Sequence, residues 1–152
     1  MEKYNLYWIE KEVARYFYHK GDILYRFLLE YINTNSPHTA IQYEYITNNI
    51  PRKDLTTYIM QKSKLKNLYI KRNKNKIHLS SNDLNVDLII QNKNIVIYAK
   101  SLLSAEKVVF PILRDFKSSF FIVGVDRDEY GWISPFLRKD YKSSYEKLYS
   151  FL

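Results

Sequence analysis

Apolar residues recur along the chain at two spacings, one typical of strands and the other typical of helices. Continuous or alternating apolar runs, which indicate strands, occupy residues 4–9, 68–79, 86–90, 95–99 and 120–123. Apolar residues three and four positions apart, which indicate amphipathic helices, occupy the segments between these runs. The pattern predicts several strands, most of them joined as hairpins, with helices packed on the sheet that they form.

Two helices are predicted directly after the first strand. The segment Lys11–Tyr18 has apolar residues around much of its circumference, and Gly21 is placed to end it. Asp22 is placed to cap the second helix. The apolar residues of that second helix follow helical spacing and are Leu24, Phe27, Leu28 and Tyr31. The first helix either lies between the sheet and a neighbouring helix or presents one apolar face to a partner, and the residues alone favour the former.

The segment from residue 37 to residue 47 carries two conflicting patterns. Ser36 followed by Pro37 is typical of a helix start. Between Ile41 and Tyr45, however, apolar and polar residues alternate, which is typical of a strand. We predict a short helix here, with a strand as the alternative.

A further helix and two hairpins are predicted in the middle of the chain. Asp54 is placed to cap the helix. The first hairpin spans Leu68–Leu79, and the second joins Val86–Ile90 to Ile95–Ala99 through a polar turn. A fifth helix-forming segment begins after the second hairpin.

That segment starts at Ser101 or Ser104 and continues to Asp115. It contains Pro111, and a proline inside a helix removes a backbone hydrogen bond and clashes with the preceding turn. We therefore predict that the helix kinks, or that its regular part ends, at this proline.

The stretch after this helix is unusual in composition. Phe120–Val123 is an unbroken apolar run of the kind found in a strand that is buried on both faces, and we predict that it is the central strand. Gly131 lies between Tyr130 and Trp132, which suggests a backbone conformation or a close approach that a side chain would block. We predict that Trp132 packs against the sheet or the helices. Beyond Pro135, a terminal helix is predicted from Tyr141, Tyr145, Leu148 and Leu152.

The order of these elements indicates an α+β domain with a mainly antiparallel sheet and helices packed on it. With 152 residues, of which 46% are hydrophobic, the chain is long enough to bury its own core. It has no internal repeat and no linker, so we expect one domain spanning residues 1–152.

Composition narrows the classes of function. The chain has no cysteine, which excludes a disulfide framework, a thiolate metal site and a cysteine nucleophile. The N-terminus lacks the apolar core of a signal peptide, and no apolar run approaches the ~20 residues of a membrane span. We expect a soluble cytoplasmic protein with no membrane contact. The net charge of +8 accompanies a bias toward Asn, Ile, Lys and Tyr that is expected of an AT-rich genome.

The residues most suggestive of an enzyme lie on the second hairpin. A metal-dependent nuclease core places an aspartate on one strand, and a carboxylate, one spacer and a lysine on the next. Asp87 and Lys100 occupy the first and last of these positions, but Tyr98 stands where the second carboxylate belongs. Glu106, on the following helix, could replace this carboxylate only if the ligand position had moved from the strand to the helix. The pattern favours a structural aspartate and lysine over a degenerate nuclease-like domain.

Other catalytic and cofactor motifs are missing. His19, His38 and His78 have no metal-ligand spacing, and the three scattered glycines cannot form a phosphate-binding loop. No serine sits in a nucleophile-elbow motif. We predict no metal, no cofactor and no enzymatic activity.

A basic stretch, Lys62–Lys76, contains seven Lys or Arg residues interleaved with Tyr69. Such a stretch can grip phosphates, which makes a basic nucleic-acid-binding domain an alternative function. Signatures of the common nucleic-acid-binding folds are absent, however, and lysines on a hairpin also protect a sheet edge from aggregation. From the sequence we do not expect direct nucleic-acid binding.

Four segments together suggest a family. They are Lys11–Ala14 after the first strand, Gln42–Pro51, Ala105–Glu106, and Tyr130–Pro135, of which the last is the most specific because rare residues fall at fixed spacing. On these segments the chain resembles, nearly end to end, the SirA family, the sporulation inhibitors of replication of endospore-forming bacteria. The resemblance implies a single SirA-like domain that acts as a non-enzymatic inhibitor, monomeric when free.

The resemblance also implies a partner and a binding face. Members of the family bind the N-terminal protein-interaction domain of the replication initiator DnaA, using two residues four apart on the first helix and a later glutamine. The matching positions here are Val13, Phe17 and Gln42. Val13 stands where the family has a larger aromatic residue, and Phe17 where it has tyrosine. Tyr18 and Tyr45 are secondary candidates by adjacency.

Overall fold

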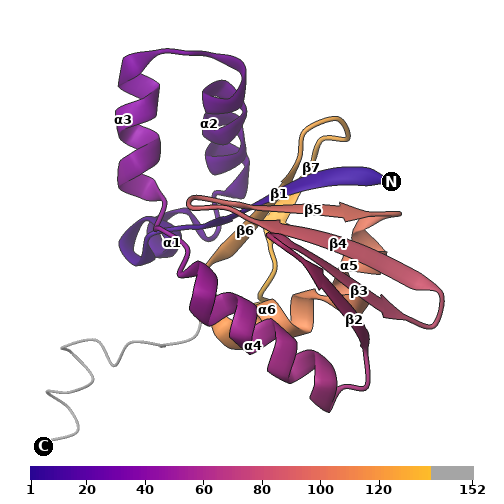
Figure 1. The fold of residues 1–152 in the computed structure, drawn as a ribbon. Coiled ribbons are helices and arrows are strands. Elements are labelled where there is room, and N and C mark those ends of the chain that lie inside the picture. The colour runs from indigo at the N-terminus through magenta and orange to yellow at the C-terminus, as the bar shows by residue number, and fades with distance from the viewer. Residues whose placement is uncertain (138–152) are drawn as a thin grey trace, which may run out of the picture.

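The computed structural model describes residues 1–137, which form an antiparallel sheet of seven strands with helices on both of its faces (Figure 1). The strands are β1 (Glu2–Trp8), β2 (Tyr69–Asn73), β3 (Lys76–Ser81), β4 (Leu84–Ile90), β5 (Ile95–Ala99), β6 (Phe120–Gly124) and β7 (Glu129–Trp132). The helices are α1 (Lys11–Phe17), α2 (Gly21–Asn33), α3 (Pro37–Ile46), α4 (Arg52–Leu65), α5 (Leu102–Val108) and α6 (Phe110–Phe116). The predicted α+β class with a mainly antiparallel sheet is confirmed. The predicted terminal helix at Tyr141, Tyr145, Leu148 and Leu152 lies outside the described residues.

The sheet order is β2-β3-β4-β5-β1-β6-β7, so the first strand of the chain is inserted between strands from its second half. Tyr4 of β1 lies opposite Ile97 of β5, and Leu6 lies opposite Ile122 of β6. The prediction that Phe120–Val123 forms the central strand is wrong, because β6 is the last strand but one. Its apolar run instead reflects burial on both faces, since helices cover both sides of this end of the sheet.

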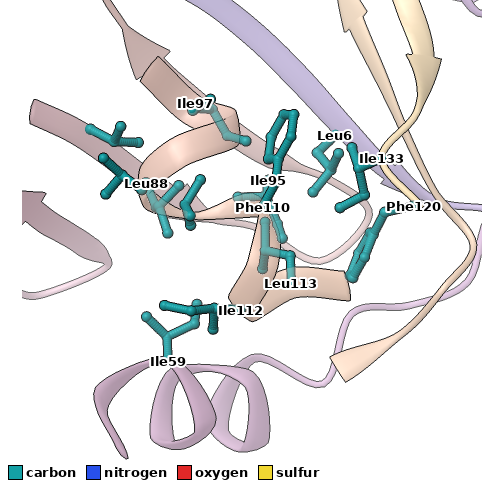
Figure 2. Packing of buried hydrophobic residues seen from close by; sticks show 14 of the residues in the cluster. Leu6, Ile59, Leu88, Ile95, Ile97, Phe110, Ile112, Leu113, Phe120 and Ile133 are labelled. Carbon is teal, nitrogen blue, oxygen red and sulfur yellow. The ribbon is translucent and has the colours of Figure 1, made fainter. Parts of the chain in front are cut away.

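One face of the sheet packs on α4, α5 and α6 and forms the larger core. Residues of β1, β3, β4, β5 and β6 that share this face are fully buried against it. Figure 2 shows Ile112 of α6 between the sheet and Ile59 of α4, with Phe110 close to Ile95. The alternating apolar pattern of the strands thus reports which side chains point toward these three helices.

On the opposite face, the helices among residues 1–137 cover one end. There α1, α2 and α3 pack on β1, β6 and β7, and the buried residues include Tyr7, Leu28, Tyr43 and Phe121. This second cluster contains no residue of β2–β5. In Figure 1 the face of β2–β5 that points away from α4, α5 and α6 has no described helix over it. We call this surface the open face.

The helix boundaries correct three capping predictions. Gly21 does not end α1 but begins α2, and no glycine among the described residues has a positive φ. Asp22 lies in the first turn of α2, where it pairs with Arg26 at 3.2 Å, and Asp54 lies in the first turn of α4. Acidic residues are favoured both at the cap and in the first turn, because the helix dipole attracts them at either place.

Other boundaries follow the sequence. Residues 37–46 are helical, as predicted from Ser36 and Pro37, so the strand alternative is excluded. Ser101 caps α5 by accepting a hydrogen bond from the Ser104 backbone N–H at 3.2 Å. Pro111 ends the regular helix: α5 stops at Val108, and the proline lies in the first turn of α6.

The predictions for Trp132 and for the neighbouring glycine had different outcomes. Trp132 packs against Phe121, with ring centroids 4.9 Å apart, as predicted. The expectation that Gly131 has a special backbone conformation or a close approach is wrong, since its φ is not positive and a Cβ there would meet nothing within 4 Å. The crowded glycine is Gly124, where a Cβ would lie 2.9 Å from the Tyr4 ring.

Candidate functional site

The hairpin residues suggestive of a nuclease are engaged with other side chains. Asp87 lies 2.6 Å from Nδ1 of His78 and 3.6 Å from Nζ of Lys76, and its cross-strand neighbour is Tyr98. Glu106 pairs with an arginine of α6. Within residues 1–137 no three His, Asp or Glu side chains are grouped so that they could hold a metal ion. The geometry therefore gives the nuclease alternative no support.

The main candidate site is an apolar groove between α1, α2 and α3. It has a volume of about 500 Å³. Its lining residues are Phe17 of α1, Ile23, Leu24 and Phe27 of α2, and Ile41, Gln42, Tyr45 and Ile46 of α3. None of these side chains is charged, and Gln42 is the only amide among them. We call this set the three-helix groove.

The third helix contributes half of the groove's lining residues, because it is apolar on two sides. Tyr43 faces inward, stacked on Tyr31 with ring centroids 3.7 Å apart and in edge contact with Tyr7 at 6.0 Å. Burial raises the pKa of the Tyr43 phenol. Ile41 and Tyr45, one helical turn apart, face outward with 70% and 74% of their surfaces exposed. The alternation that resembled a strand is therefore a helix with a buried and an exposed apolar side.

The first helix is fixed in place by its own cap and by the core. The Glu10 carboxylate accepts hydrogen bonds from the backbone N–H groups of Glu12 and Val13, both at 3.0 Å. Ala14 is fully buried beneath the helix. Phe17, at the end of α1, is half-buried and lines the groove, so its ring is held on one side and available on the other.

The five residues predicted for the site fall in three places. Phe17, Gln42 and Tyr45 line the groove together. Val13 is half-buried and packs against the second core cluster, one turn before Phe17. Tyr18 is directed toward β7 and the residues after it, away from this lining.

The surroundings of Tyr18 are those of a structural residue. Its hydroxyl donates a hydrogen bond to the Ser134 carbonyl oxygen at 2.7 Å. Its ring stacks on Trp132 with centroids 5.3 Å apart. Burial raises the pKa of the Tyr18 phenol. These interactions tie the end of α1 to the segment that follows β7.

Several groove residues were missed from the sequence, namely Ile23, Leu24, Phe27, Ile41 and Ile46. Ile41 could have been found, because it lies four residues before Tyr45 and four apart means one face in a helix. The residues of α2 could not, since Phe27 lies within the stripe that also packs on the core. Only the packing of α2 beside α3 brings these two apolar edges together.

The lining determines what the groove can do. It has no carboxylate, imidazole, amine or thiol, and its one ionisable group is the phenol of the exposed Tyr45. Open, apolar and rimmed by exposed Ile and Tyr side chains, it suits the apolar side chains of another protein, for which exposed apolar patches are typical binding sites.

No described helix of residues 1–137 is long and apolar enough to cross a membrane.

Comparison with known proteins agrees with the segments recognised in the sequence. No curated protein matches the chain. Residues 2–137 match the family described as sporulation inhibitor of replication protein SirA. Because this match covers most of the sequence, the chain belongs to the SirA family of sporulation inhibitors of replication.

Proposed function

We propose that this protein inhibits the start of DNA replication during sporulation by binding the N-terminal domain of DnaA in the three-helix groove. The observation that supports the proposal is the meeting of Phe17, Gln42 and Tyr45 in one apolar groove. Two of these positions, Phe17 and Gln42, match the binding face implied by the family resemblance. The protein acts by occupying its partner rather than by catalysis, in the cytoplasm where replication takes place.

Phe17 is the anchor of the proposed interface. Its ring packs against the second core cluster and lines the groove beside residues of α2 and α3, so a partner side chain entering the groove would contact an aromatic surface that the core already holds. Aromatic residues near the centre of an interface often cost about 2 kcal/mol or more of binding energy when truncated. Truncation of Phe17 should therefore weaken binding about thirtyfold or more.

Gln42 makes the proposed interface selective for particular partners. Its exposed amide and the Tyr45 hydroxyl are the polar side-chain groups of an otherwise apolar lining. A partner that seals the groove must supply hydrogen bonds to this amide, because a buried polar group left unpaired costs about 1–3 kcal/mol. Partners without a matching polar group are disfavoured.

Calorimetric titration of the protein with the isolated DnaA domain tests the proposal. Ile41→Asp places a charge on the groove at a side chain that is 70% exposed, so the fold is kept while binding is lost. The matched control is Leu103→Asp on α5, which changes a 61% exposed apolar residue outside the groove and leaves binding intact. Absence of binding at tens of micromolar, or equal effects of the two variants, contradicts the proposal.

A further inference from the structure

The open face of the sheet carries a row of polar and aromatic side chains across five strands. Directly opposite neighbours in this row are Lys71 of β2, His78 of β3, Asp87 of β4, Tyr98 of β5 and Lys3 of β1. The adjacent strand positions point into the core beneath α4, α5 and α6. All five side chains therefore point to the side that no described helix covers.

Positive charge is concentrated at one edge of this face. Lys71 of β2 and Lys76 of β3 point to this face, and Lys74 lies in the exposed turn that joins the two strands. The other basic residues between Lys62 and Lys76 lie on α4, at its end or, for Arg72, on the covered side of β2. No Asp or Glu occurs between Asp54 and Asp83. Across the chain 24 of 152 residues are Lys or Arg, so an even bias toward lysine does not explain the cluster. The one acid in this row, Asp87, lies 3.6 Å from Nζ of Lys76, so the lysine offsets its charge, and its other carboxylate oxygen lies 2.6 Å from Nδ1 of His78.

The same edge also presents an aromatic ring. Tyr69 of β2 points to the open face two positions before Lys71 and is 63% exposed. Its ring meets that of His78 edge-on, with centroids 6.4 Å apart. Tyr98, three strands further in, is half-buried on the same face. Exposed aromatic rings flanked by lysines on a sheet are the features with which proteins stack unpaired bases and hold the phosphates between them.

We propose that the open face binds single-stranded nucleic acid, with Tyr69 stacking on a base and Lys71, Lys74 and Lys3 contacting phosphates. A single strand is favoured over a duplex because stacking on Tyr69 needs the face of an unpaired base. A second copy of the chain is disfavoured at this edge, since the lysines of two β2 strands would repel each other. The face is separate from the three-helix groove, which lies over the other end of the sheet.

The sequence alone did not predict nucleic-acid binding, because the basic stretch has no recognisable binding motif. The chain pattern placed the lysines on a hairpin edge, which also protects against aggregation. It did not reveal that Tyr69 and Lys71 share a face with residues of four further strands, over which no helix of the described chain lies.

Fluorescence anisotropy with labelled oligothymidine and oligouridine, each roughly 20 nucleotides long to exceed one binding site, tests the proposal. Binding should weaken steeply between about 50 and about 200 mM salt as released counterions oppose it. Tyr69→Ala should weaken binding about tenfold through the lost stacking. The matched control is Tyr16→Ala on α1, which removes an equally exposed tyrosine (64%) outside the open face and should leave binding unchanged.

The charge contribution has its own matched pair. Lys71→Gln with Lys74→Gln should weaken binding and lower the salt slope by about 1.4, because each phosphate that is no longer neutralised lowers it by about 0.7. Lys53→Gln with Lys107→Gln removes the same net charge from positions outside the open face and should have little effect. Equal losses in the two double variants would show attraction by net charge alone and overturn the proposal.

Three other outcomes also overturn it. The first is no binding of either oligonucleotide at tens of micromolar protein. The second is equal binding of a duplex of the same length together with no effect of Tyr69→Ala. The third is a dimer, seen by light scattering without oligonucleotide, that the Tyr69 substitution dissociates. Thermal unfolding of every variant confirms that it is folded.

Discussion

Replacing Gly124 by alanine tests the packing of the sheet at the point where it is tightest. An added Cβ would lie 2.9 Å from Cε1 and 3.0 Å from Cδ1 of Tyr4. Carbon atoms in favourable contact are about 3.5–4.0 Å apart, so the ring would have to move by roughly half an ångström or more. Tyr4 is 1% exposed and belongs to the larger core, which leaves its ring little room.

The expected cost follows from these distances. Overpacking of a filled core costs about 1–3 kcal/mol. Replacing a glycine also lowers the conformational entropy of the unfolded chain, which stabilises the folded protein by about 0.4–1 kcal/mol. The net change for Gly124→Ala is therefore a loss of roughly 0–2.6 kcal/mol.

Gly131→Ala is the matched control on the neighbouring strand. A Cβ there meets nothing within 4 Å, and its φ is not positive, so the substitution should be neutral or slightly stabilising. Urea unfolding followed by tryptophan fluorescence measures both free energies of unfolding. The two variants should differ by about 1–3 kcal/mol, which is the clash alone. Equal stabilities would refute the account of Gly124, and Tyr4→Leu should reduce the difference if the ring is its cause.

Three further predictions concern single side chains. Tyr18→Phe removes the hydrogen bond to Ser134 and should lower the free energy of unfolding by about 0.5–1.5 kcal/mol. Binding of the DnaA domain should be unchanged. Weaker binding with unchanged stability would contradict the structural role of Tyr18. Burial raises the pKa of Tyr7 and Tyr43 above the ordinary value of 10.0, so the unfolded chain loses these protons first. Stability should fall as pH rises above about 10, by up to about 1.4 kcal/mol per pH unit for each phenol. Melting temperatures across this range should fall less steeply for Tyr43→Phe, and an unchanged slope would contradict this cause. Ser101→Ala should lower the free energy of unfolding by about 1 kcal/mol, because it removes the cap of α5. An unchanged free energy of unfolding in urea would contradict this role of Ser101.

The strands and most helices could be predicted because their patterns are local. Side chains that alternate between core and solvent mark strands such as β3, where Ile77 and Leu79 are buried and their neighbours are not. The order of the strands could not be predicted in this way. The place of β1 between β5 and β6 depends on pairings between residues far apart in sequence, for example Lys3 with Tyr98.

Burial on both faces was easier to recognise than position in the sheet. The apolar run of β6 predicted that both its faces are covered, which is correct, but this was taken to mean a central strand. A strand near an edge has the same composition when helices pack on both sides of that edge. Here α2 packs beside β7 on one face, and Phe120 and Ile122 join the larger core on the other.

The candidate groove was predictable in part. Phe17 and Gln42 were identified through the family resemblance and Tyr45 by adjacency, but their common lining with Phe27 depends on how three helices meet. The alternating residues of α3 misled because a helix that is apolar on opposite sides resembles a strand in sequence. The exposed apolar side of α3 was itself evidence for a binding site, since packing on the core needs one apolar side of a helix and not two.

The central claim is that the three-helix groove is the surface that binds the DnaA domain. The most direct measurement is nuclear magnetic resonance of the isotope-labelled protein during titration with the unlabelled domain. We predict that amide signals of α1, α2 and α3 around Phe17, Phe27 and Gln42 shift or broaden, while those around Tyr69 on the open face stay unchanged. Perturbations that centre on the open face, or that spare the groove, would contradict this claim.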